Sequence, residues 1–239
     1  MIEFFSNIRT EIPQMPLLIH SLILSVLPFL MWLTLVNRDK PLYKTIWSIL
    51  LGLQLITIYT WFFWAKLPLS ESLPLYHCRI GMFVVLLARP RILKDYFALL
   101  GVVGGVLAMI HPDFYPYQFL HVTNIFFFIG HFALFVLSLL HLMTQSNLDK
   151  LNPKLIIQLT LLINMSLIFI NLLTGGNYGF MMKTPILGIT NPFLNLLIVT
   201  TLLSFLVLFV KQIFQKVRMR ASLKQKNLNY FNIIILSSY

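Results

Sequence analysis

Long apolar runs separated by short polar and basic connections make up most of this chain of 239 residues. A helix of about 20 apolar residues crosses roughly 30 Å of hydrocarbon, because each residue adds about 1.5 Å. Runs of about this length predict seven transmembrane helices, over residues 17–36, 43–64, 73–88, 95–110, 119–143, 155–173 and 193–210. The pattern therefore predicts an all-α, polytopic membrane protein.

The third run allows two starting points. Pro74 can open a helix, because a proline in the first turn loses no hydrogen bond, but that helix would have only about 16 residues. A start near Leu67 lengthens the helix to about 22 residues and places Cys78 about 16 Å along it. We adopt the start near Leu67, since it removes the length deficit.

Composition supports a membrane protein and narrows its class. The chain is 58% hydrophobic and 10% charged, with a mean hydropathy of +0.83, whereas soluble domains carry about a quarter charged residues. All seven carboxylates lie outside the apolar runs or at their edges, which disfavours a proton-coupled carrier that relies on buried carboxylates. The net charge of +11 comes from basic loops and a basic C-terminal stretch, as topology signals do, so we expect no nucleic-acid partner.

The basic residues also indicate an orientation. Of the 18 lysines and arginines, 14 fall in the odd-numbered connections or after residue 210. The positive-inside rule then places the N-terminus outside and the C-terminus in the cytoplasm. We expect one membrane domain over residues 1–210 and a basic cytoplasmic tail over residues 211–239.

The third run also carries the main chemical candidates. Its polar head places Cys78, the only cysteine, between His77 and Arg79. Polar groups in hydrocarbon often mark functional sites. The plainer alternative is that the thiol packs as a small hydrophobe and that Arg79 extends to the headgroups. A lone cysteine excludes an intramolecular disulfide and a CxxC motif.

Two histidines and a loop are predicted to lie near this thiol. His121 and His131 are ten residues apart in the fifth predicted helix, which separates them by about 15 Å along the axis and about 80° around it. The loop with Asn177 and Tyr178 falls on the same outer side. Six residues are therefore expected to share one outward-opening pocket: Cys78, Arg79, His121, His131, Asn177 and Tyr178.

A nucleophilic thiol needs access, a base and a donor for the developing oxyanion. Either histidine can be the base, Arg79 can supply a positive field, and Asn177 or Tyr178 can donate. Interfacial or interhelical roles are the alternative for each histidine. His141 continues the ten-residue spacing but would lie roughly 30 Å from His121, too far to share one ion, so we expect no metal or cofactor.

Three segments carry a resemblance to a known family: LPLYHC, HVTNIFFFIGH and GGNYGFMMKTP. Together they resemble the bacterial YwaF family of integral membrane proteins, which is related to animal transmembrane protein 164, a phospholipid acyltransferase with a proposed cysteine active centre. The resemblance implies that Cys78 is the nucleophile, His131 its partner and His121 an accessory. It also implies a bacterial cytoplasmic membrane and phospholipid or lysolipid partners. Gly179 departs from it, since a bulky apolar residue is expected there.

Two functions follow from these observations. The first is a membrane acyltransferase that moves a fatty acyl chain between lipids through a cysteine thioester. The alternative is a non-catalytic membrane protein that binds a lipid or small solute, or a transporter. The acyl donor, the acceptor and the oligomeric state are left open.

Overall fold

The computed structural model describes residues 4–185 and 187–237, and over these residues all regular secondary structure is helical. The helices, in chain order, are α1 (Leu17–Asn37), α2 (Pro41–Trp64), α3 (Leu69–Ser72), α4 (His77–Leu87), α5 (Ile92–Ile110), α6 (Val122–Thr144), η1 (Leu148–Lys150), α7 (Pro153–Thr174), η2 (Tyr178–Phe180) and α8 (Pro192–Ser237). The all-α prediction is confirmed. The extreme ends of both expected domains lie outside the described residues.

Six of these helices are long and apolar enough to cross a membrane: α1, α2, α5, α6, α7 and the part of α8 up to Met219. They correspond to six of the seven helices expected from the apolar runs. The chain is therefore a multi-pass membrane protein. The remaining expected helix does not form one uninterrupted span.

The third predicted helix is broken. The four residues of α3 are followed by extended backbone at Leu73 (φ −72°, ψ 148°), and α4 begins only at His77 and has 11 residues. The expected continuous helix from about Leu67 is therefore wrong. Its cause is Pro74, because a proline disfavours helical backbone at the residue before it.

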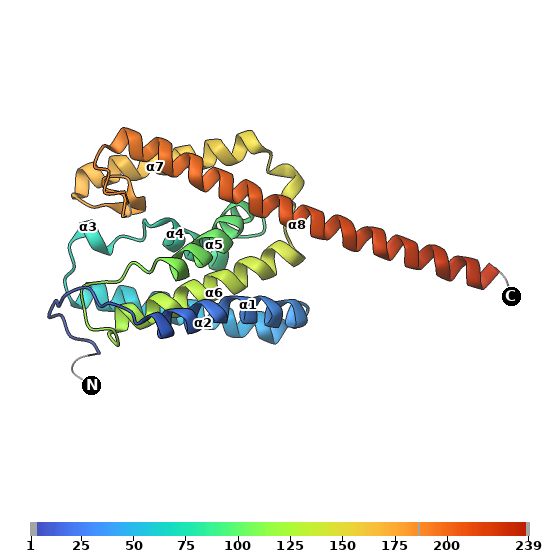
Figure 1. Ribbon diagram of the computed structural model, residues 1–239, viewed down its shortest axis with the longest axis horizontal. Helices are drawn as coiled ribbons and strands as arrows, with labels where there is room; N and C mark the ends of the chain where they lie inside the picture. Colours follow the sequence, from blue (N-terminus) through green and yellow to red (C-terminus); the bar gives the residue numbers. More distant parts are fainter. Residues whose placement is uncertain (1–3, 186, 238–239) are drawn as a thin grey trace.

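Figure 1 shows α1, α2 and α6 on one side of the molecule, α7 and α8 on the other, and α4 and α5 between them. The most extensive pairings are α5 with α6, α2 with α6, α4 with α5, and α7 with α8. In each of the spans α5 and α6, 67% of the residues in the most apolar stretch are buried within the protein, against 17–33% in the other four spans. The centre of the bundle is thus α5 and α6, and α4 packs directly on both.

The helix α8 continues without interruption past Val210, where the basic tail was expected to begin. In Figure 1 it extends well beyond the other helices. Arg218 on this continuation donates to the Ser146 carbonyl at 2.8 Å and also to the Leu142 carbonyl. These contacts tie the start of the basic stretch to the end of α6. The cytoplasmic location of the stretch stays a prediction.

Two tyrosines satisfy the backbone where the third predicted helix is broken. The Tyr178 hydroxyl donates to the Leu69 carbonyl at 2.5 Å and accepts the Leu73 N–H at 2.9 Å. The Tyr115 hydroxyl donates to the Glu71 carbonyl at 3.3 Å. Non-helical backbone at membrane depth is tolerated only where the protein itself supplies such partners. These hydroxyls therefore stabilise the break that Pro74 introduces.

Tyr178→Phe is expected to lower the thermal unfolding temperature, because it leaves one N–H and one carbonyl of the break without a partner. Such a loss costs about 1–3 kcal/mol. Tyr59→Phe is the matched control, since the buried Tyr59 hydroxyl has no partner among the described residues. Thermal unfolding of the detergent-purified variants measures both. Equal unfolding temperatures for the two variants would contradict this role of Tyr178.

Candidate functional site

The break places Cys78 in the first turn of a new helix. Cys78 is the second residue of α4, and the N-cap residue Tyr76 provides no side-chain cap. The first N–H groups of a helix have no partner within it, and the helix dipole makes this end favourable for negative charge. Residues 71–80 are all partly exposed. The thiol is thus in a partly exposed segment, beside N–H groups that the helix itself leaves without partners.

A glycine on α5 makes room for the thiol. A Cβ placed on Gly104 would lie only 2.6 Å from Cys78 Sγ, so any side chain at residue 104 would displace the sulfur. A Cβ on the next residue, Gly105, would lie 3.5 Å from the His131 carbonyl oxygen. Consecutive residues are about 1.5 Å apart along a helix. The Cys78 sulfur and the backbone of α6 at His131 therefore pack against neighbouring residues of α5.

His131 has the tautomer that a base requires. Its Nδ1 lies 2.7 Å from the Phe127 carbonyl oxygen, and a carbonyl can only accept, so Nδ1 carries the proton. In the neutral ring Nε2 is then the acceptor. Within the described residues, the His131 ring and the Cys78 thiol are not hydrogen-bonded to each other. Catalytic hydrogen bonds are often long before substrate binds.

Arg79, the residue after the cysteine, lies among aromatic rings. Its Nη2 donates to the Tyr115 hydroxyl at 2.9 Å, and its guanidinium carbon lies 4.9 Å from the centre of the Phe62 ring. Tyr59 and Tyr76 also present their rings, at 5.9 and 5.7 Å. Its Nη1 is buried and has no partner among the described residues. A buried charged donor without a partner is costly, and it is available to a ligand oxygen.

His121 is occupied within the protein. Its Nε2 donates to the Ser6 carbonyl at 2.8 Å, and its Nδ1 accepts the Thr123 N–H at 3.2 Å at the start of α6. The side chain is 1% exposed, and burial lowers the pKa of His121. The neutral ring therefore caps α6 and attaches the N-terminal segment.

Asn177 and Tyr178 hold the loop between α7 and α8. Asn177 Oδ1 accepts the N–H groups of Met182 and Lys183, each at 2.9 Å, while its Nδ2 donates to the Lys183 carbonyl. The Tyr178 hydroxyl is committed to the break between α3 and α4. Of the six residues expected to share a pocket, the structure places Cys78 and Arg79 in the first turn of α4, while His131 lies on α6, which packs directly on α4. The other three use their polar atoms to hold the surrounding segments.

His77 belongs to this region although the sequence did not single it out as a site residue. Its Nε2 lies 2.7 Å from Asn164 Oδ1, and Asn164 Nδ2 donates to Thr200 at 2.9 Å. Asn164 thus presents its carbonyl oxygen, so His77 donates through Nε2. This chain of bonds connects α4 with α7 and α8. An asparagine inside an apolar run was the available signal, because polar side chains in membrane helices need partners.

Gly179 makes the position of the His77 ring possible. Its φ is +65°, and a Cβ there would lie 2.7 Å from His77 Cε1 and 2.6 Å from Leu167 Cδ1. A bulky residue at 179, as the family resemblance suggested, is incompatible with this packing. Glycine is therefore required both by the backbone conformation and by the ring beside it.

Gly179→Ala is expected to destabilise the protein more than Gly175→Ala. Both glycines have positive φ, +65° and +71°, but a Cβ on Gly175 meets nothing within 4 Å. Strain alone costs about 1–3 kcal/mol, and Gly179→Ala adds the displacement of His77. Thermal unfolding and the rate of Cys78 alkylation measure the two effects. Equal unfolding temperatures and alkylation rates in both variants would show that the His77 contact is unimportant.

The fold and this region define the class: a helical multi-pass membrane protein with a cysteine at the start of a broken helix. The family model described as the TMEM164 family matches residues 4–212. The chain belongs to the TMEM164 family. No curated protein and no solved structure matches it.

Proposed function

We propose that this protein is an integral membrane acyltransferase that moves a fatty acyl chain between lipids through a thioester on Cys78. The observation that carries the proposal is the placement of Cys78 at the uncapped start of α4, packed against Gly104 of α5, while the backbone of α6 at His131 packs against the neighbouring Gly105. The resemblance to transmembrane protein 164, a phospholipid acyltransferase, supports the same reaction. The partners are membrane phospholipids as donors and lysolipids, or another hydroxyl or amine, as acceptors.

In the first half-reaction His131 Nε2 accepts the thiol proton as the sulfur attacks the ester carbonyl carbon of the donor. The carbonyl π electrons move to oxygen, and the resulting oxyanion needs donors. When the carbonyl re-forms, the carbon–oxygen ester bond breaks and the leaving alkoxide takes the proton back from His131. The products are a lysolipid and an acyl thioester on Cys78.

The second half-reaction reverses these roles. His131 accepts a proton from the acceptor hydroxyl or amine as it attacks the thioester carbonyl carbon. Collapse of the tetrahedral intermediate breaks the carbon–sulfur bond, and the thiolate recovers the proton from His131. No net oxidation, reduction or hydrolysis takes place, so the cycle requires neither a cofactor nor water.

Two kinds of donor in the first turn of α4 suit the charges of this cycle. The free N–H groups in the first turn of α4 are donors for an oxyanion formed beside Cys78. The unpartnered Arg79 Nη1 is suited to a phosphate or carbonyl oxygen of the lipid, because a guanidinium forms strong charge-assisted bonds to such oxygens. His121, Asn177 and Tyr178 position the segments that surround these groups in this proposal.

We further infer the orientation from the distribution of charge, with the N-terminus outside and the C-terminus in the cytoplasm of a bacterial cell. The Cys78 end of α4 then faces the outer half of the membrane. The donor and acceptor lipids are accordingly drawn from the outer leaflet.

Cys78→Ala is expected to abolish acyl transfer, and His131→Ala is expected to slow it by about 10²–10⁴-fold, as loss of a general base does. His111→Ala is the matched control, since His111 is an exposed histidine on the same side of the bundle. Transfer of an isotope-labelled acyl chain from phospholipid to lysolipid in proteoliposomes measures all three. A Cys78→Ala variant with wild-type transfer would overturn the proposal and favour the non-catalytic lipid-binding alternative.

A further inference from the structure

A second polar site lies at the opposite end of the bundle from the first turn of α4. The start of α2, the end of α4, the start of α5 and the end of α6 meet there around a cavity of about 100 Å³. The cavity is lined by Lys44, Ser48, Val85, Leu86, Lys94, Leu137, Leu140, His141, Thr144 and Gln145. Val85 is seven residues beyond Cys78 on α4, so the two sites are about 10 Å apart along the axis.

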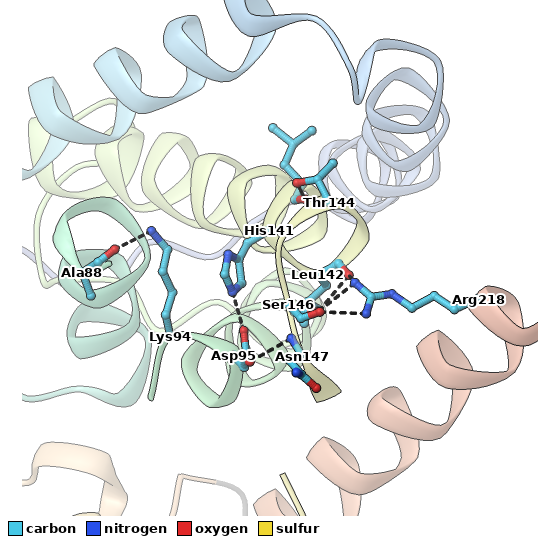
Figure 2. Close-up of polar contacts among 10 residues, drawn as sticks. Ala88, Lys94, Asp95, His141, Leu142, Thr144, Ser146, Asn147 and Arg218 are labelled. Carbon is cyan, nitrogen blue, oxygen red and sulfur yellow. Dashed lines mark hydrogen bonds and ion pairs between the residues drawn. The ribbon is translucent and has the colours of Figure 1, made fainter. Parts of the chain in front are cut away.

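His141 presents an unused nitrogen at this site. Its Nε2 lies 2.6 Å from Asp95 Oδ1, and Asp95 Oδ2 accepts the Asn147 N–H at 3.1 Å (Figure 2). The carboxylate therefore fixes Nε2 as the donor. The His141 side chain is 4% exposed, and its Nδ1 is buried without a partner among the described residues. His141 lines the cavity and Asp95 does not. The imidazole therefore faces the cavity with the edge that points away from the carboxylate.

Two lysines add positive charge to the same cavity. Lys94 is 8% exposed and donates to the Ala88 carbonyl at 2.8 Å (Figure 2), which leaves two further N–H groups of its ammonium for a ligand. Lys44 lines the cavity from α2. Among the described residues that line it, none is acidic. The cavity therefore combines two ammonium groups and an unpartnered imidazole nitrogen with no compensating negative charge of its own.

We propose that this cavity binds a phosphate group. Its polar groups come from three helices, which suits a tetrahedral anion with several oxygens better than a planar carboxylate. The lysine ammonium groups donate to phosphate oxygens, and His141 Nδ1 accepts the O–H of a singly protonated phosphate, because Asp95 fixes the ring proton on Nε2. The cavity is too small for an acyl chain, so the bound group is the phosphate itself, carried by a lipid headgroup or free in solution.

The test uses the full-length protein in nanodiscs of phosphatidylcholine, with inorganic phosphate as the first probe. Isothermal titration calorimetry measures binding, and Lys44→Ala is expected to weaken it about three- to tenfold. Lys154→Ala is the matched control, because Lys154 is an exposed lysine at the start of α7, outside the cavity. In a second arm, the nanodiscs also contain phosphatidic acid, which tests a lipid headgroup as the ligand. If the headgroup binds, phosphatidic acid raises the unfolding temperature of the wild type and raises that of Lys44→Ala much less.

Saturable binding in either arm, sensitive to Lys44→Ala and insensitive to Lys154→Ala, supports the proposal and identifies the source of the phosphate. If the two lysine variants weaken binding equally, the binding reflects general surface charge, and the proposal is overturned. Absence of a response in both arms would overturn it as well. His141→Gln is a second variant, and if it does not fold, the lysine pair alone decides. The acyl-transfer assay is not involved, so this outcome is independent of the proposed reaction.

Discussion

The structure depends on hydrogen bonds to a backbone that is not helical. Inside a membrane protein every buried peptide group must be satisfied by the protein, yet Pro74 prevents the segment between α3 and α4 from forming its own helical hydrogen bonds. The hydroxyl groups of Tyr178 and Tyr115 take over at Leu69, Leu73 and Glu71. These tyrosines come from loops more than 40 residues away along the chain. The break is thus held by the tertiary structure as a whole.

The break before α4 also determines which polar groups surround Cys78. A continuous helix would have used the N–H groups of the first turn of α4 in its own hydrogen bonds. Because the helix restarts at His77, these donors are left beside Cys78 and next to a guanidinium with an unused Nη1. Gly104 and Gly179 then leave room for the thiol and for the His77 ring. The thiol, the guanidinium and the N–H groups, which would be costly to bury in an uninterrupted helix, together form the candidate site.

The apolar runs predicted six long helices correctly, because length and hydropathy are the properties that make a helix able to cross a membrane. The prediction of the third helix was wrong. The apolar run after Pro74 is too short for a full span, and the extension to Leu67 ignored the local effect of the proline on the backbone before it. The sequence placed Cys78 level with His131 only through a helix start near Leu67, which is wrong. In the structure the Cys78 sulfur and the His131 carbonyl oxygen lie against neighbouring glycines of α5, Gly104 and Gly105. The role of His121 was not accessible, since its partner Ser6 lies 115 residues away. The same holds for His77 and Asn164, which are 87 residues apart.

The central claim is that the break before α4 presents Cys78 as an acyl carrier, and intact-protein mass spectrometry tests it most directly. After incubation with a phospholipid of defined acyl chains and without an acceptor, the protein is expected to gain the mass of one acyl group. Fragmentation should locate that group on Cys78, and neutral hydroxylamine should remove it, as it does a thioester. An unmodified protein, or an acyl group that resists hydroxylamine, would contradict the account.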